Sequence, residues 1–159
     1  MKFVSKEIID APLDTVWHTL AKAPALQDWA QSRNLTLTRN DDGTALDIGT
    51  SWSAQVAFVI VKGTIKAEIT KLVPSKRIVL QVSIRGIDAT IRLALKADTA
   101  RKTQLRVATT LKSSSIMGPV ALLALSTQDA LIANRHETLT KNLADYISEN
   151  WPLYPVTGA

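Results

Sequence analysis

The feature that most constrains the fold of this chain is a change in the spacing of its apolar residues. Between about Thr50 and Lys112 apolar residues alternate with polar ones, and beyond Pro119 they follow the spacing of a helix. Alternation is typical of strands with one buried face, whereas a period near 3.6 is typical of an amphipathic helix. The sequence therefore predicts an α+β fold in which an antiparallel sheet is followed by a helix.

Several segments alternate in the manner of strands, and Gly, Pro, Asn and Asp residues separate them. These segments cover residues 2–10, 34–39, 50–60, 64–72, 77–85, 89–96 and 104–112. Polar and charged side chains occupy the complementary positions, as expected for a sheet with one solvated face. We expect about six or seven strands.

Helical spacing occurs both before and after the alternating segments. After Pro12 the apolar residues of positions 13–20 share one helical face, and residues 25–29 favour a second short helix. From Pro119 to about Glu149 no residue breaks a helix, so one long helix is expected there. Its inner stripe is expected to contain Ala121, Leu125, Gln128, Ile132, Arg135, Leu139, Leu143 and Tyr146, with Asp129 and His136 at its flank.

The composition of this 159-residue chain excludes several classes of protein. It has no Cys, which removes disulfides, iron–sulfur clusters, thiolate nucleophiles and Cys-based zinc sites. Its six Gly are isolated, so there is no Gly-rich phosphate loop, and its two His do not form a zinc motif. We therefore expect neither a metal nor a cofactor.

The length and the apolar runs set the expected organisation. The N-terminal segment is already charged, and no apolar run approaches the ~18 residues of a membrane span. We expect a cytoplasmic protein with a single domain over residues 1–150 and a C-terminal tail over residues 151–159.

The net charge of +5 is unevenly distributed. Residues 62–112 hold twelve Lys and Arg against three acidic residues, and the alternation places most of them on the outer face of the sheet. Such a face can simply be solvated, or it can meet phosphates, an anionic membrane surface or a partner. No nucleic-acid motif accompanies it, because no aromatic residue is interleaved with the charges for base stacking.

Local motifs occur in a characteristic order along the chain. Ile-Asp-Ala-Pro at 9–12 leads from the first strand into the first helix, Leu-Gln-Asp-Trp at 26–29 lies in the second, and Leu-Val-Pro-Ser-Lys-Arg-Ile at 72–78 connects two strands. Over residues 3–149 this order resembles the helix-grip fold of the START-like (SRPBCC) superfamily, which includes polyketide cyclases, birch-pollen-type allergens and lipid-transfer domains. The resemblance implies a curved sheet wrapped around the long C-terminal helix, with an apolar cavity between them.

The stripe of the long helix supplies candidate ligand contacts. A buried polar group needs a partner, since burial without one costs about 1–3 kcal/mol. Arg135 can reach a partner at the rim while its stem covers apolar surface. Alternatively, Gln128, Arg135 and His136 orient the polar end of an amphipathic ligand, and Ile132 and Leu139 contact its apolar part.

Three aromatic residues have a similar double interpretation. Trp29, Trp52 and Phe58 are either core residues or a platform for a ligand. The resemblance implies that the second helix, and with it Trp29, borders the mouth of the cavity.

The favoured function is binding or transport of a hydrophobic or amphipathic small molecule, such as a lipid, a quinone or a polyketide-like compound. The alternative is an enzyme of the polyketide cyclase, aromatase or dehydratase type that uses polar groups of the long helix. Asp129 and His136 are separated by about 10 Å along that helix, too far for a hydrogen-bonded pair, so catalysis is disfavoured. A second alternative is a partner-docking module that uses the basic outer face.

Overall fold

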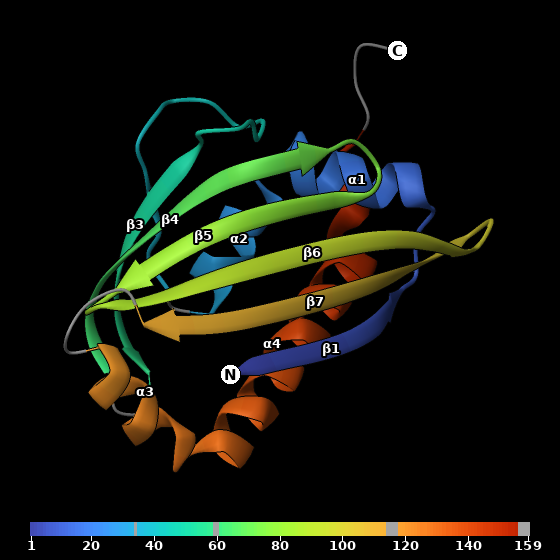
Figure 1. The fold of residues 1–159 in the computed structure, drawn as a ribbon. Helices are drawn as coiled ribbons and strands as arrows, with labels where there is room; N and C mark the ends of the chain where they lie inside the picture. Colours follow the sequence, from blue (N-terminus) through green and yellow to red (C-terminus); the bar gives the residue numbers. More distant parts are fainter. Residues whose placement is uncertain (34, 59–60, 114–117, 156–159) are drawn as a thin grey trace.

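Seven strands form one antiparallel sheet that curves across a long C-terminal helix (Figure 1). The computed structural model describes residues 1–33, 35–58, 61–113 and 118–155. The strands are β1 (Lys2–Ile9), β2 (Thr38–Arg39), β3 (Ser51–Phe58), β4 (Val61–Val73), β5 (Arg77–Ile84), β6 (Ile87–Thr99) and β7 (Lys102–Ser113). The expected α+β helix-grip architecture is confirmed.

The order of the strands brings the first and last of them together. Along the sheet the order is β1-β7-β6-β5-β4-β3-β2, so consecutive strands from β2 to β7 are neighbours, while β1 pairs with β7. The register places Phe3 opposite Thr109 and Ser5 opposite Val107. β1 is therefore an edge strand whose inward side chains lie next to those of β7.

Most strands lie where the alternation predicts them. β4 and β6 extend beyond the predicted segments to 13 residues each. Of the predicted strand 34–39, residue 34 lies outside the described part of the chain, and residues 35–39 contain only the two residues of β2. Residues 59–60 and the side chain of Phe58 lie outside the part of the chain that is described. Arg85 and Gly86, with φ of 45° and 77°, form the tight turn between β5 and β6 and so fix the register of that hairpin.

Two short helices follow the first strand, as predicted. α1 (Leu13–Ala21) begins after Pro12 and α2 (Ala25–Ser32) begins after Pro24. Proline suits these positions because its fixed φ and missing N–H cost nothing at a helix start. The inward side chains of α1 join the main core beneath the sheet.

The expected single long helix is wrong in one respect, because the structure divides it at Gln128. The two parts are α3 (Gly118–Ser126) and α4 (Asp129–Asn150). The hydroxyls of Ser126 and Thr127 each donate to the carbonyl three residues earlier, at 2.6 and 2.7 Å. Such side-chain bonds compete with the helical ladder and favour its end.

The buried face of α4 is also rotated relative to the predicted stripe. Thr140 faces inward, and its burial leaves no hydroxyl unpaired because the hydroxyl donates to the His136 carbonyl oxygen at 2.9 Å. Arg135 is exposed, since a buried charge is costly, and Gln128 is a half-buried residue just before the helix. The prediction that Arg135 lies on the inner stripe is therefore wrong, and Gln128 lies between the two helices rather than within one. The buried residues of α4 are Ile132, Thr140, Leu143, Ala144 and Ile147.

The segment after α4 folds back toward α2. A 3₁₀ turn, η1 (Trp151–Leu153), follows α4 directly. The Tyr154 hydroxyl donates to Asp28 Oδ2 at 2.7 Å and lies 2.8 Å from the Tyr146 hydroxyl, which therefore donates to it. These bonds attach α2 to the C-terminal end of α4.

Candidate ligand-binding cavity

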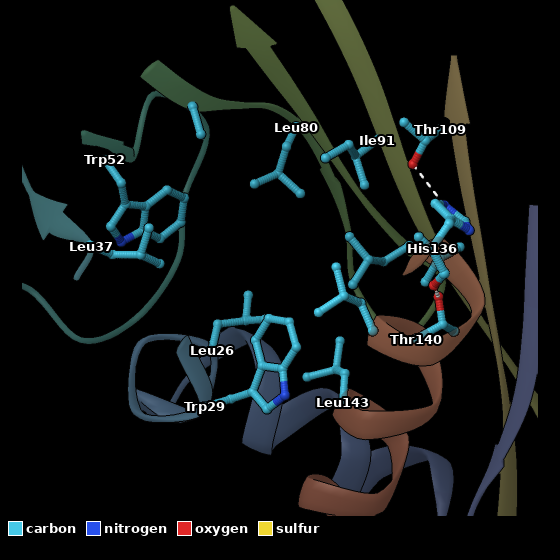
Figure 2. Close-up of a pocket in the computed structure, with 14 residues that line it drawn as sticks. Leu26, Trp29, Leu37, Trp52, Leu80, Ile91, Thr109, His136, Thr140 and Leu143 are labelled. Carbon is cyan, nitrogen blue, oxygen red and sulfur yellow. Dashed lines mark hydrogen bonds between the residues drawn. The ribbon is translucent and has the colours of Figure 1, made fainter. Parts of the chain in front are cut away.

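A cavity of about 250 Å³ lies between the inner face of the sheet and α4 (Figure 2). Its wall is almost wholly apolar, which suits the body of a hydrophobic ligand. The lining residues are Leu26, Trp29, Leu37, Trp52, Ala67, Leu80, Ile91, Leu93, Val107, Thr109, His136, Leu139, Thr140 and Leu143.

Side chains aligned across the sheet form one wall of the cavity. The registers of β4 to β7 place Leu80, Ile91 and Thr109 in one row and Leu93 and Val107 in the next. All of them face α4 because strand residues two apart point to the same side. Thr109 thus lies in the same row between the branched apolar residues of β5 and β6 and Phe3 of β1.

One end of the cavity is polar, and its polar side chains are paired with one another. His136 Nδ1 lies 2.7 Å from the Ser5 hydroxyl oxygen, and His136 Nε2 lies 2.9 Å from the Thr109 hydroxyl oxygen. The Phe3 ring lies beside the imidazole, with 6.0 Å between ring centroids. The imidazole is therefore held between strands β1 and β7 through both of its nitrogens.

The charge state of His136 follows from its burial. Removal of the ring from water lowers the pKa of His136 below its ordinary value of 6.5, because the charged form loses more solvation than the neutral form. A neutral imidazole has one N–H and one bare nitrogen. Hence one of the two hydroxyls accepts a hydrogen bond from the ring and the other donates one to it.

The opposite end of the cavity is aromatic, and its polar groups are unpaired. Figure 2 shows Trp52 and Leu37 on the side away from His136, with Trp29 below them. Among the described residues, Trp29 Nε1 and Trp52 Nε1 are buried without a hydrogen-bond partner. An indole N–H is a donor only, so each of these groups lacks an acceptor.

The structure brings together half of the side chains predicted to contact a ligand. Trp29, Trp52, His136 and Leu139 line the cavity, with Leu139 40% exposed. The other four are placed elsewhere or are not described. Ile132 packs in a separate cluster with Phe3, Ile87 and Leu125, Gln128 and Arg135 do not line the cavity, and the side chain of Phe58 is outside the described part.

Sequence reasoning missed the partners of His136. Ser5 and Thr109 are polar residues at inward positions of their strands, but Glu7 and Thr103 share those faces, so the pattern alone does not single them out. Which histidine they meet depends on the pairing of β1 with β7 and on the rotation of α4, and neither is written in the local pattern.

Neither a metal centre nor a membrane-spanning helix is found within the described ranges. No group of three or more His, Asp or Glu residues there is arranged to hold a metal ion. No helix in that part of the chain combines the length and the apolar character needed to cross a bilayer.

Comparison with known proteins relates this geometry to a family. The family model described as Activator of Hsp90 ATPase homolog 1-like protein, or AHSA1, matches residues 10–120, well over half of the chain. The chain belongs to the AHSA1-like family. This family lies in the START-like (SRPBCC) superfamily, so the resemblance seen in the sequence is confirmed. No curated protein matches the chain.

Solved structures share the fold of this AHSA1-like chain at low identity. DynU16, from the dynemicin biosynthetic locus, is 16% identical with a TM-score of 0.62, and the match covers 97% of this chain and 49% of DynU16. This chain therefore spans about half the length of DynU16. TTHA0849 from Thermus thermophilus is 14% identical with a TM-score of 0.65, over 92% of this chain and 97% of the other.

A third match is PFC0360w from Plasmodium falciparum, described as an HSP90 activator. It is 17% identical with a TM-score of 0.50, over 69% of this chain and 72% of the other. At such identities the likeness concerns the fold alone.

Proposed function

We propose that this AHSA1-like chain binds a small hydrophobic or amphipathic molecule in the cavity between the sheet and α4. The observation that carries the proposal is the cavity itself, whose wall is almost wholly apolar and whose polar lining residues, Thr109, His136 and Thr140, gather at one end. Binding sites for small molecules combine these features, because the apolar wall supplies affinity and the polar groups fix orientation. Membership of a superfamily of ligand-binding domains supports the same conclusion.

The volume narrows the class of ligand. About 250 Å³ lies just below the roughly 300–1,000 Å³ range of pockets for drug-sized ligands. Of the classes expected from the sequence, a compact ring compound such as a quinone or a polyketide-derived aromatic fits this space better than an entire membrane lipid. A hydrogen-bond acceptor on the ligand can pair with an indole N–H only after the ring turns, because both nitrogens are buried in the empty protein.

A dye-binding experiment with a cavity-filling variant tests the proposal. Ala67 lines the cavity, so Ala67→Leu should fill part of it and weaken the binding of 1-anilinonaphthalene-8-sulfonate at least tenfold. Native mass spectrometry of the purified protein, followed by solvent extraction, should in parallel reveal any co-purified compound.

A matched substitution on the other face of the sheet is the control. Ala94 pairs with Arg77 and Arg106 on the outer face, so Ala94→Leu should leave dye binding unchanged. Equal dye binding by the wild type and both variants would mean that the dye sits elsewhere, and would contradict the proposed function.

The outer face of the sheet supports a second candidate function, the docking of an acidic partner protein. Cross-strand registers align Arg77, Arg106 and Lys6 in one row, and Arg92 lies in the next. Such a concentration of positive charge attracts an acidic surface at long range. The family description names an activator of the Hsp90 ATPase, so an Hsp90-type chaperone is the first partner to try.

Salt dependence tests this second candidate. Association through the basic face should weaken steeply between about 50 and 300 mM NaCl, because salt screens exposed charges. The double variant Arg92→Glu and Arg106→Glu should abolish the association. The control double variant Lys22→Glu and Lys141→Glu, which changes charge at the end of α1 and in α4 instead, should not. Association that is insensitive to salt would contradict this candidate.

A further inference from the structure

His136 separates two hollows of the molecule. On one side is the apolar cavity described above, which Thr109 also lines. On the other side is a groove of about 450 Å³ between the edge strand β1 and α4, which Ser5 also lines. The charged groups of this groove come from both elements: Lys2 and Lys6 from β1, and Asp129 and Glu137 from α4. The imidazole and its two hydroxyl partners therefore run from a polar groove to an apolar cavity.

The hydrogen bonds of these three residues can run in either direction. With the ring proton on Nε2, the ring donates to Thr109, and the Thr109 hydroxyl is left to donate into the cavity. Ser5 then donates to Nδ1 and can accept from the groove. With the ring proton on Nδ1, every bond is reversed, so Thr109 accepts from the cavity and Ser5 donates into the groove.

Both directions are compatible with the surroundings. The groove contains ammonium donors and carboxylate acceptors, and water reaches it, so the free end of Ser5 can be satisfied either way. Thr140, the remaining hydroxyl of the cavity wall, is not part of this arrangement, because it donates to the His136 carbonyl oxygen within α4. The cavity end of the arrangement is therefore Thr109.

We propose that Ser5, His136 and Thr109 form a hydrogen-bond chain of reversible direction, through which the cavity binds a small ring compound by either a carbonyl or a hydroxyl group. The proposal rests on the proposed function and deepens it. A ligand carbonyl accepts from Thr109 and selects the Nε2–H form of the ring. A ligand hydroxyl can donate to Thr109 in the Nδ1–H form, and it favours that form because accepting from Thr109 instead would leave its own O–H unpaired in the apolar cavity.

The two forms contain the same protons. In each, Ser5 and Thr109 keep one hydroxyl hydrogen and the ring keeps one N–H, so no proton is gained or lost overall. Interconversion of the Nε2–H and Nδ1–H forms requires only that the ring release a proton to water from one nitrogen and take one from water at the other. The ligand class is thus a carbonyl compound and the alcohol of the same skeleton, which the site accepts equally well.

The test compares 2-tetralone with 2-tetralol, which share one bicyclic skeleton, by isothermal titration calorimetry. The wild type should bind the two within about threefold of each other. Two-bond ¹H–¹⁵N NMR of labelled His136 should show the Nε2–H form with the ketone and the Nδ1–H form with the alcohol.

Ser5→Val is the decisive variant because Ser5 lies on the far side of the ring from the ligand. Without the Ser5 hydroxyl, the Nδ1–H form leaves a buried N–H unpaired, at a cost that corresponds to about fivefold or more in affinity. The variant should therefore prefer the ketone by about fivefold. A purely structural role of Ser5 would weaken both probes equally.

Variants at residue 109 complete the experiment. Thr109→Val should weaken both probes and leave their ratio near one, Thr109→Ser should restore both, and Thr110→Val, with its side chain on the outer face, should change neither. Binding of both probes with a ratio that Ser5→Val does not move would overturn the hydrogen-bond chain and leave the proposed function standing. Failure of both probes to bind would count against the proposed function, and the proposal of the hydrogen-bond chain would fall with it.

Discussion

The two ends of the cavity hold their polar groups in opposite ways. At the polar end, which is called the α4 end below, both nitrogens of His136 have a hydroxyl within 2.9 Å. The imidazole and each of the two hydroxyls can either donate or accept. At the aromatic end, the N–H groups of Trp29 and Trp52 can only donate and have no acceptor. At the first end both imidazole nitrogens are paired without a ligand, whereas at the second end both indole donors are unpaired.

Because of this difference, the α4 end should matter chiefly for stability and the aromatic end chiefly for ligand recognition. Paired polar groups at the α4 end contribute to the fold whether or not a ligand is present, since removing one partner leaves the others buried and unpaired. Unpaired donors at the aromatic end lower the stability of the empty protein and become favourable only when an acceptor arrives. Substitutions at the two ends should therefore affect different measurements.

The largest expected effect is on stability, at the α4 end. His136→Leu removes the partner of two buried hydroxyls and should lower the free energy of unfolding by about 2–4 kcal/mol, measured by urea denaturation. Trp52→Phe, which removes an unpaired donor along with some ring area, should cost about 1 kcal/mol or less. Equal losses in the two variants would show that the ends do not differ in this way.

The general architecture was predictable because it depends on local patterns. The alternation in residues 50–112 predicts strands on physical grounds, and Pro12 and Pro24 mark helix starts for the same reason. The division of the C-terminal helix was not predicted, because Ser126 and Thr127 differ from ordinary exposed helix residues only in where their hydroxyls bond. Apolar periodicity alone does not report such bonds.

The site was predictable only in part. Inward aromatic residues are visible in the pattern of a strand, so Trp52 was identified, and Trp29 followed from the resemblance of the second helix. His136 was placed at the flank of the stripe, but its partners are 131 and 27 residues away in sequence. Contacts of that range depend on strand order and on helix rotation. The inward assignment of Arg135 failed because the predicted stripe included Leu139 and not Thr140, whose hydroxyl is paired within the helix and which is buried.

The second prediction concerns recognition at the aromatic end. Trp52→Phe should weaken the binding of 1,4-naphthoquinone about two- to tenfold, because one hydrogen bond to an acceptor is lost. It should leave the binding of naphthalene, which has no acceptor, nearly unchanged. Fluorescence titration of both probes against the wild type and the variant measures the difference. A similar loss for both would show that Trp52 acts only through its ring area.

The third prediction concerns how the aromatic end is held. Tyr154 donates to Asp28, the neighbour of Trp29 in α2, and burial together with its bonds to Tyr146 and Asp28 raises the pKa of Tyr154, so it stays protonated at neutral pH. Tyr154→Phe should lower stability by about 0.5–1.5 kcal/mol and speed amide hydrogen exchange in α2. Tyr146→Phe keeps the bond to Asp28 and should leave α2 exchange closer to that of the wild type. Identical exchange in all three proteins would contradict this role of Tyr154.

The smallest expected effect is a pH dependence that arises at the α4 end. Burial lowers the pKa of His136 below 6.5 in the folded state, so at mildly acidic pH the unfolded chain binds more protons at this residue than the folded one. His136 therefore favours folding less as the pH falls from neutrality through 6.5 toward its folded pKa, and protonation also removes the bare nitrogen that accepts from a hydroxyl.

Thermal unfolding at pH 7, 6 and 5 tests this dependence, with His136→Gln as the reference because glutamine does not titrate. Contributions from other groups, such as Asp41 with its lowered pKa beside Arg39, are common to both proteins and cancel in the comparison. The melting temperature of the wild type should fall more steeply than that of His136→Gln. Parallel profiles would mean that His136 has the same pKa in the folded and unfolded chains, and the paired end of the cavity would then differ from the aromatic end in hydrogen bonding alone.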